Sequence, residues 1–336
     1  MKFQLSRRTL IAAGVALCSS FLISCGGGGG TPAATTVPPG SKAGKHLKLA
    51  FVANNTSDFW TYAKAGVMKA KTEIDDIDVD FQMPGDGQAG TQKRIVEDLL
   101  VKGEDGIAIS PIDPANQTDF LNKVASQAVL VTQDSDAPQT NRTVYIGTDN
   151  RAAGVQAGEL LKKVLPDGGK VMIFVGSLDA QNAKDRRAGL MDAIKDTKIQ
   201  VLDTRTDDTD RGRAKSNVQD ALVKNPDIAG LVGLWSYNGP AILSAARDAK
   251  VNGKVKIVCF DEEEATLEGV KSGDISGTIV QQPYEFGRKS MHVMADYLRK
   301  DASEVPASKQ IFVPTRVIDK DGVDAFMGQL KEYKAQ

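Results

Sequence analysis

Aromatic and hydrogen-bonding side chains recur directly after apolar runs in both halves of the chain. The main candidates for ligand contact are Phe59, Trp60, Asp134, Arg186, Trp235, Asp261 and Gln281, with Asn55 and Ser57 as weaker ones. Flat rings can cover the C–H face of an uncharged polyol, while carboxylate, guanidinium and amide groups bond its hydroxyls. In open α/β sheets, ligands bind beyond the carboxyl ends of the strands. This mixture of residues predicts a site for a neutral, hydroxyl-rich ligand.

Each candidate also has a purely structural interpretation. Phe59 and Trp60 open a helix, so one of them is expected in the core. Asp134 can cap a turn, and Asn55 or Ser57 can cap the following helix. The helix dipole alone would explain the acidic run that begins at Asp261. The remaining alternatives are a solvated charge for Arg186, an interface ring for Trp235 and a hinge hydrogen bond for Gln281.

The elements that must position these side chains alternate along the chain from His46 onward. Strands are predicted at 47–53, 79–83, 106–110, 128–132, 143–147, 170–175, 199–204, 228–233, 255–260 and 275–280. Helices are predicted at 59–74, 91–102, 116–127, 153–165, 183–197, 211–224, 239–249, 265–271 and 283–299. Repeated strand–helix–strand units imply parallel sheets with helices on both faces. About ten strands exceed one comfortable sheet, so we expect an α/β fold with two doubly wound parallel-sheet lobes.

Length and composition agree with a globular body and exclude some function classes. The chain has 336 residues, 41% apolar and 25% charged, with a formal net charge of -1. At about 150 residues per domain, this length suggests two domains. The basic residues form no stripe, so we expect no nucleic-acid partner. Catalytic motifs are missing from the sequence: there is no phosphate-binding loop, no Gly-x-Ser-x-Gly elbow and no His-Glu-x-x-His.

Metal and cofactor chemistry also lacks support in the sequence. The two histidines, His46 and His292, have no partners at ligand spacing. Neither stands beside a plausible nucleophile. Asp134 and Asp261 resemble a glycosidase pair in residue type, but the two-lobe organisation places them in opposing lobes as hydrogen-bond acceptors. We therefore expect a binding protein that is not an enzyme and that needs no metal and no cofactor.

The N-terminal segment has the features of an export signal. Residues 1–24 hold Lys2, Arg7 and Arg8 and no acid, so removing them leaves 39 basic against 43 acidic residues, a net charge of -4. The uncharged run at 10–23 is shorter than the about 20 residues of a membrane span. Leu22-Ile23-Ser24-Cys25 resembles a bacterial lipobox, which implies lipid attachment at Cys25. An ordinary secretory signal with an incidental cysteine is the alternative. Ser6–Ile11 also resembles a twin-arginine motif, and a plain basic region fits it equally well.

The segment after this signal has the composition of a tether. Five glycines at 26–30 lead into a stretch rich in Thr, Pro and Ala that ends near residue 45. Such a stretch buries too little apolar area to fold, so it is expected to link a lipid-bearing Cys25 to the globular body. Cys18 would be removed with the signal. Cys259 lies in an apolar run and is expected as a buried core thiol.

Several segments, in a consistent order, resemble the ribose type of periplasmic sugar-binding protein, the type I family of solute receptors that serve ABC importers. They are Ser57–Trp60 (Asn-Pro-Phe-Phe in the family), Val131–Ser135 (Leu-Asp-Arg), Lys184–Gly189 (Arg-x-Arg-Gly-x-Gly), Val258–Asp261 (Val-Gly-Phe-Asp) and Thr278–Pro283 (Ala-x-x-x-Gln-x-Pro). The resemblance covers residues 47–317. It implies that Phe59 or Trp60 stacks on a sugar. Its implied hydroxyl-binding residues are Asp134, Arg186, Asp261 and Gln281.

Three departures from the family pattern bear on which sugar is bound. Ser135 replaces an Arg that binds ribose hydroxyls, Trp60 is larger than the family Phe, and Trp235 falls near a ligand Asn. These changes put ribose itself in doubt and suit a hexose or another polyol. The resemblance also implies three crossings between the lobes, near Thr148, Gln282 and Pro314-Thr315, where a simple two-domain chain would have one linker. Hinges of a few residues would let the lobes close around the ligand.

The resulting domain prediction has four parts. Residues 1–24 are a signal peptide of lipoprotein type, and 25–45 are the lipidated cysteine and flexible tether. Residues 46–149 with 283–314 form the first lobe, and 150–282 with 315–336 form the second. The resemblance implies an exported, lipid-anchored monomer, periplasmic or at the cell surface, that passes a monosaccharide to an ABC permease and its ATPase.

Two further functions remain open at this point. A receptor could present a sugar, or the cyclic furanosyl signal autoinducer-2, to a membrane signalling protein, and the sequence does not separate this from transport. Sugar-sensing repressors share the two-lobed body, but they carry an N-terminal helix-turn-helix. Here a lipoprotein-like signal stands in that place.

Overall fold

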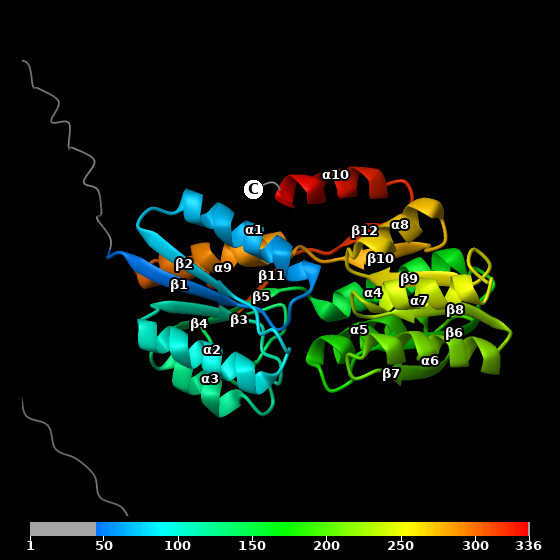
Figure 1. Cartoon of the computed structure of the whole chain (residues 1–336), viewed down its shortest axis with the longest axis horizontal. Coiled ribbons are helices and arrows are strands. Elements are labelled where there is room, and N and C mark those ends of the chain that lie inside the picture. Colours follow the sequence, from blue (N-terminus) through cyan, green and yellow to red (C-terminus); the bar gives the residue numbers. More distant parts are fainter. Residues whose placement is uncertain (1–44, 335–336) are drawn as a thin grey trace, which may run out of the picture. The chain divides into compact units, whose positions relative to one another are not determined.

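The computed structural model describes residues 45–334, which contain two six-stranded sheets (Figure 1). The predicted signal segment, Cys18, Cys25 and the tether before residue 45 lie outside the described residues. Within them, every predicted strand and helix is present, and no end is displaced by more than three residues. None of the described helices is long and apolar enough to cross a lipid bilayer.

The first sheet is wholly parallel and has the order β11-β5-β4-β3-β1-β2. Its strands are β1 (Leu47–Val52), β2 (Ile77–Gln82), β3 (Gly106–Ile109), β4 (Val129–Gln133), β5 (Val144–Gly147) and β11 (Gln310–Phe312). Helices α1 (Asp58–Glu73) and α9 (Pro283–Leu298) share an apolar cluster with one face, and α2 (Ala89–Lys102) and α3 (Thr118–Ala125) share another with the opposite face. Buried apolar runs in the strands make this two-faced core possible.

The second sheet repeats the plan in the order β12-β10-β9-β8-β6-β7. Its strands are β6 (Gly169–Val175), β7 (Ile199–Thr206), β8 (Ile228–Gly233), β9 (Lys256–Phe260), β10 (Gly277–Val280) and β12 (Arg316–Ile318). Helices α4 (Asn150–Val164) and α5 (Gln181–Ile194) pack on one face, and α6 (Arg211–Lys224), α7 (Asn238–Asp248) and α8 (Glu264–Ser272) on the other. The predicted fold class, two doubly wound α/β lobes, is therefore confirmed.

The end of the chain differs from the sequence-based prediction. No element is predicted after residue 299, and the structure has β11, β12 and α10 (Val323–Lys334) there. The two strands are three residues long, too short for a periodic signal, and β12 pairs antiparallel with β10. Helix α10 buries only Val323, Phe326 and Leu330. This i, i+3, i+7 spacing is a helical signal that the sequence analysis missed.

Polar side chains connect the segments that pass between the two sheets. After β5, Thr148 donates a 2.9 Å hydrogen bond from Oγ1 to Oε1 of Gln281, which follows β10. Next to it, Gln282 donates from Nε2 to the carbonyl of Pro314 over 2.7 Å. Thr315 in turn donates to Gln156 of α4. These bonds hold three chain segments side by side where the lobes join.

Candidate ligand-binding site

Asp134 is the first residue after β4, and its carboxylate is buried at the end of the first sheet. Oδ2 accepts hydrogen bonds from Ser110 Oγ at 2.9 Å and from Asn54 Nδ2 at 3.4 Å. Its backbone has φ 59°, in the left-handed region that Asp tolerates better than most residues. Ser110 follows β3 and Asn54 lies just beyond β1, so three neighbouring strand ends hold this carboxylate in place.

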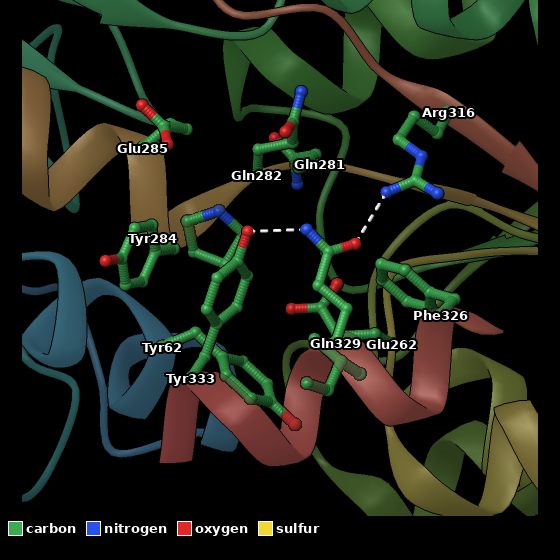
Figure 2. Close-up of a pocket in the computed structure, with 12 residues that line it drawn as sticks. Tyr62, Glu262, Gln281, Gln282, Tyr284, Glu285, Arg316, Phe326, Gln329 and Tyr333 are labelled. Carbon is green, nitrogen blue, oxygen red and sulfur yellow. Dashed lines mark hydrogen bonds between the residues drawn. The ribbon is translucent and has the colours of Figure 1, made fainter. Parts of the chain in front are cut away.

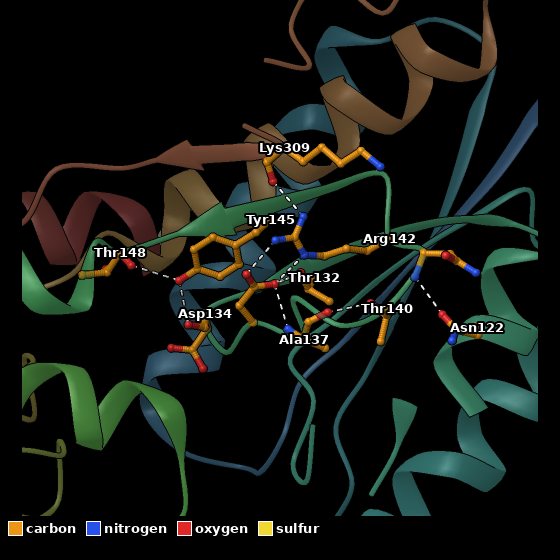
Figure 3. A network of polar contacts seen from close by, with 11 residues as sticks. Asn122, Thr132, Asp134, Ala137, Thr140, Arg142, Tyr145, Thr148 and Lys309 are labelled. Atoms are coloured by element: carbon orange, nitrogen blue, oxygen red, sulfur yellow. Dashed lines mark hydrogen bonds and ion pairs between the residues drawn. The ribbon is translucent and has the colours of Figure 1, made fainter. Parts of the chain in front are cut away.

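The loop that carries Asp134 is braced by the network shown in Figure 3. The Tyr145 hydroxyl lies 2.9 Å from the carbonyl oxygen of Asp134 and 3.0 Å from that of Thr148, so the two acceptors share its single proton. Nearby, the Arg142 guanidinium donates hydrogen bonds from Nε and Nη2 to the two carboxylate oxygens of Asp136, over 2.6 and 2.7 Å. Bidentate pairs of this kind fix geometry as well as charge. The network therefore joins the Asp134 loop to the first segment between the lobes.

Asp261 occupies the corresponding place in the second lobe, directly after β9. Its carboxylate accepts a 2.8 Å bond from Gln281 Nε2, and its carbonyl oxygen accepts one from Thr278 Oγ1 at 2.7 Å. It too has a left-handed backbone, with φ 67°. Gln281 also accepts a hydrogen bond from Thr148. The same side chain therefore makes the predicted hinge hydrogen bond and contacts Asp261, a predicted ligand-binding residue.

Arg186 brings a buried cation to the same region from helix α5. It is 1% exposed. Its guanidinium donates from Nε to Asn150 Oδ1 and from Nη1 to the carbonyl of Leu234, at 2.9 and 2.8 Å. Nη1 also lies 3.9 Å from Asp261 Oδ2, and the guanidinium carbon lies 4.6 Å from the ring centre of Phe260. The alternative of a solvated surface charge is therefore wrong for Arg186.

Close packing of α4 against α5 sets the position of Arg186. A Cβ atom added at Gly154 of α4 would lie 2.0 Å from the carbonyl oxygen of Arg186, and one added at Gly189 of α5 would lie 2.0 Å from that of Arg151. Real Cβ atoms do not approach backbone this closely, so any larger residue would push the helices apart. The two glycines thus let the arginine backbone approach the neighbouring helix.

The three charged groups influence one another across the lobes. Burial raises the pKa of Asp134 to about 6, the Arg186 cation opposes that rise, and the Asp261 carboxylate adds to it. Burial likewise raises the pKa of Asp261. The Arg186 charge and the hydrogen bond from Gln281 lower this pKa. Asp134 follows β4 of the first lobe, whereas Asp261 follows β9 and Arg186 lies in α5 of the second. The structure therefore brings a carboxylate of one lobe near an ion pair of the other.

Trp235 follows β8 and is half-buried at the same end of the second sheet. Its indole Nε1 is buried, with no hydrogen-bond partner within the described residues. Tyr237 meets the ring edge-on at 6.4 Å and donates its hydroxyl proton to Asp207. Asn238 accepts from the Trp235 backbone N–H and donates to Asp207. Tyr237, Asn238 and Asp207 thus form a frame that fixes the Trp235 ring. The indole N–H of Trp235 is left to donate to a further acceptor.

Phe59 and Trp60 open α1 as predicted, and both are buried in the apolar cluster of the first lobe. Their ring centres lie 4.9 Å apart at 81°. Trp60 donates from Nε1 to Asn54 Oδ1. Asn55 is exposed and accepts from the backbone N–H of Ser57, and Ser57 is the N-cap of α1 without a side-chain capping bond. Stacking of either ring on a ligand stays a prediction.

Sequence reasoning missed several residues that hold the site together. They are Asn54, Ser110, Asn150, Asp207 and Tyr237. Asn54, Ser110 and Asp207 lie beyond the carboxyl ends of β1, β3 and β7, so the rule that identifies Asp134 and Asp261 would have found them. Asn150 begins α4, and only its burial beside Arg186 reveals its role. Within residues 45–334, no group of three His, Cys, Asp or Glu side chains could hold a metal ion.

Comparison with known proteins identifies the family. Residues 49–302 match a family model described as a periplasmic binding protein domain. The chain belongs to this family. A D-allose-binding periplasmic protein of Escherichia coli K12 is 26% identical over 265 residues, which is 76% of this chain and 85% of the relative. A ribose import binding protein of Bacillus subtilis 168 is 27% identical over 251 residues, or 74% and 80%.

Solved structures show the same relationship in three dimensions. An ABC transporter solute binding protein of Burkholderia graminis C4D1M, in complex with D-arabinose, matches with TM-score 0.77 and 29% identity, over 83% of this chain and 96% of the other. A glucose-galactose binding protein of Geobacillus stearothermophilus matches with TM-score 0.78 and 26% identity, over 83% and 99%. The predicted resemblance to ribose-type periplasmic sugar-binding proteins is thereby confirmed. These relatives are binding proteins rather than enzymes, as expected for this chain.

Proposed function

We propose that this protein is the substrate-binding lipoprotein of an ABC sugar importer and that it binds a monosaccharide between its lobes. The observation that carries this proposal is the buried cluster of Asp134 from the first lobe and Arg186 and Asp261 from the second, whose charges act on one another. Carboxylate oxygens and a fixed guanidinium suit the hydroxyls of a neutral sugar better than they suit an anion or an apolar ligand. Relatives that bind allose, ribose or arabinose support this chemistry.

The proposed mechanism uses contacts from both lobes to make the closed form the better binder. Asp134 approaches the sugar from the first lobe, and Arg186, Asp261 and Gln281 approach it from the second. The apolar face of the sugar lies against Trp235 and against Phe59 or Trp60. Because a ligand shifts a conformational equilibrium by its differential affinity, sugar favours closure. The domain boundaries proposed above make Thr148, Gln282 and Pro314-Thr315 the hinge.

The departures from the family pattern define the proposed sugar class. Ser135 is buried beside Asp134 and offers a hydroxyl where ribose-binding relatives of the family place a guanidinium. A long cation is thereby replaced by a short neutral group, and Trp235 adds ring area with a free indole donor. We propose a hexose or another polyol rather than ribose. Flat rings cover the C–H face of such a ligand well.

The remaining proposals concern where the protein works. The lipobox-like sequence supports lipid attachment at Cys25, and more than one acyl chain is what stable anchoring requires. An exported, monomeric receptor would then deliver sugar to an ABC permease, whose ATPase supplies the energy. Cys25→Ser should release the mature protein from the membrane fraction. Retention of that variant with the membranes would contradict the anchor.

A thermal-shift screen tests the sugar assignment. The ligands are aldoses, ketoses, sugar alcohols and autoinducer-2, with amino acids and nucleosides as the comparison set. A ligand at about 100 times its dissociation constant adds roughly 2.7 kcal/mol to the free energy of unfolding, so one or a few sugars should raise the melting temperature clearly. A shift with amino acids or nucleosides and none with any polyol would overturn the proposal. A shift with autoinducer-2 alone would favour the receptor function instead.

A further inference from the structure

A small cavity lies beside the segments that join the lobes, and it shares Gln281 with the proposed sugar site (Figure 2). It measures about 20 Å³, which is room for one water molecule. Helices α1, α9 and α10 and the segments around Gln281 and Arg316 line it. Glu262, the residue after the proposed sugar ligand Asp261, contributes a carboxyl group to its wall. The cavity therefore adjoins both the hinge and the sugar site.

Glu262 is the unusual feature of this cavity. Its side chain is buried, with the residue 4% exposed, and neither carboxylate oxygen has a hydrogen-bond partner within the described residues. An ionised carboxylate left unpaired in such a place is costly, and the usual response is to take up a proton. Arg316 is the cation of the cavity wall. Its guanidinium donates to Gln329 Oε1 at 2.8 Å and lies 5.3 Å from the ring centre of Phe326.

The other charged and titratable groups around Glu262 give it no counter-charge. Its own segment carries Asp261 and Glu263. Helix α1 presents Tyr62 with Asp58 nearby, α9 presents Tyr284 and Glu285, α8 begins at Glu264, and α10 presents Tyr333 with Lys334 beyond it. Lys334 lies 4.0 Å from Asp58 and over the Tyr62 ring. The acids therefore outnumber the cations. Lys334 is paired with Asp58, and Arg211 of α6 with Glu263 at 3.3 Å. Arg316 bonds the Gln329 amide and forms no ion pair within the described residues.

Elements of both lobes cover Glu262. Tyr62 belongs to α1 of the first lobe, yet it packs in the apolar cluster of the second lobe. Helix α10 is anchored in that same cluster by Val323, Phe326 and Leu330. From there its Tyr333 reaches back to stack on Tyr284 of α9, with ring centres 4.0 Å apart. Separating the lobes would pull Tyr62 and Tyr284 away and open the cavity to water.

We propose that Glu262 takes up a proton when the two lobes close, so that capture of ligand weakens as the pH rises. This inference rests on the proposed function, since it concerns closure around a sugar. Burial raises the pKa of Glu262 well above its ordinary range, and the charges of Asp261 and Glu263 add to the rise. In the open form the carboxyl meets water, where a glutamate titrates near about 4.3.

The sign of the effect follows from this difference. Below about pH 4.3 the carboxyl is protonated in both forms, and closure takes up no proton. Above that pH, closure must bind a proton until the pH exceeds the pKa of the closed form. Over this interval the dissociation constant of the sugar should rise by up to tenfold per pH unit.

Isothermal titration calorimetry of the full chain tests the closure step. Sugar binding is measured between pH 4.5 and 8.5 in buffers of different ionisation enthalpy, which gives the number of protons taken up per sugar. The wild type should take up close to one proton more than Glu262→Gln, and the variant should bind the sugar more tightly than the wild type at pH 8. Glu264→Gln, the same change at an exposed neighbour, should behave as the wild type. Equal uptake by wild type and E262Q would overturn the proposal.

A second measurement needs no sugar and keeps the two proposals separable. If no sugar gives a binding heat, the proposed function fails, while burial of Glu262 is still testable by melting. The melting temperature of E262Q should exceed that of the wild type by a margin that grows from pH 5 to pH 8, because only the wild type must bury or protonate an acid. A margin that does not grow would overturn the burial of Glu262 on which proton uptake depends.

Discussion

Asp134 and Asp261 are equivalent residues of two similar lobes. Each is the first residue after the fourth strand of its sheet counted from the β2 or β7 edge, each has φ near 60°, and each has a backbone carbonyl oxygen that accepts a bond from a hydroxyl side chain. The left-handed backbone turns the chain sharply at the strand end. Two carboxylates from opposite lobes thus act on one another beside Arg186. Under the proposed function, each would accept a hydrogen bond from a hydroxyl of the sugar.

Asp261→Asn isolates the contribution of the carboxylate. Asn tolerates the left-handed backbone and keeps the side-chain shape, so the fold should survive, whereas Ala there adds about 1 kcal/mol of backbone strain. Loss of an ionised acceptor to a sugar hydroxyl should weaken binding by at least tenfold, since hydrogen bonds to charged groups are worth about 1.5–3 kcal/mol. Calorimetry with the sugar found by thermal shift measures this. Unchanged affinity would remove Asp261 from the site.

Arg186→Lys tests whether the guanidinium shape matters as well as its charge. An ammonium group cannot donate to Asn150 and to the Leu234 carbonyl in the same fixed fork. We expect unfolding free energy to fall by about 1–3 kcal/mol and sugar affinity to fall at least tenfold. The matched control is Arg187→Lys, because Arg187 is half-buried and donates from Nε to Thr204. Urea unfolding and calorimetry of both variants should separate them, and similar losses in the two would contradict the role of Arg186.

At the scale of elements, the close packing of α4 against α5 stabilises the fold and also positions Arg186. Gly189→Ala would place a methyl group 2.0 Å from the Arg151 carbonyl oxygen. Overpacking of this kind costs about 1–3 kcal/mol, and the shift in α5 should also move Arg186 and weaken sugar binding. Gly90→Ala in α2 is the control, since nothing lies within 4 Å of a Cβ there. It should leave affinity unchanged and stabilise by up to about 1 kcal/mol. Equal behaviour of the two variants in urea unfolding would refute the packing argument.

The sequence predicts the elements well because their signals are local. Apolar strands, helical spacing and the polar residues at strand ends identify the two lobes and place Asp134, Arg186 and Asp261. Prediction from the sequence fails where a feature depends on residues that are distant along the chain. Strand β11 is three residues long and depends on its partner β5. The frame of Asp207 and Tyr237 around Trp235 depends on contacts between residues about 30 positions apart. The burial of Glu262 depends on helices from both ends of the chain.

At the scale of the whole molecule, contact between the lobes joins groups that would otherwise titrate independently. Helix α10 crosses from the apolar cluster of the second lobe to Tyr284 and Tyr62 of the first, so the chain end itself contributes to the contact between lobes. Arg186 of α5 and Asp261 after β9 both act on Asp134, which follows β4 of the other lobe. The stability of the molecule should therefore carry a pH dependence that neither lobe has alone.

The pH dependence of unfolding tests this coupling through Asp134. The pKa of Asp134 is raised by burial to about 6, against about 3.9 in an unfolded chain, so the folded state binds this proton more tightly. The resulting stabilisation is complete below about pH 4 and is lost as the pH rises through 6, for a total of roughly 3 kcal/mol. Asp134→Asn cannot titrate and should lack this loss. Urea unfolding at pH 4 and pH 7 measures the free energy of unfolding of both proteins. Between these pH values, that of the wild type should fall by roughly 3 kcal/mol more than that of the variant. If the two proteins differ in free energy of unfolding by the same amount at both pH values, the pKa of Asp134 is not raised in the folded protein.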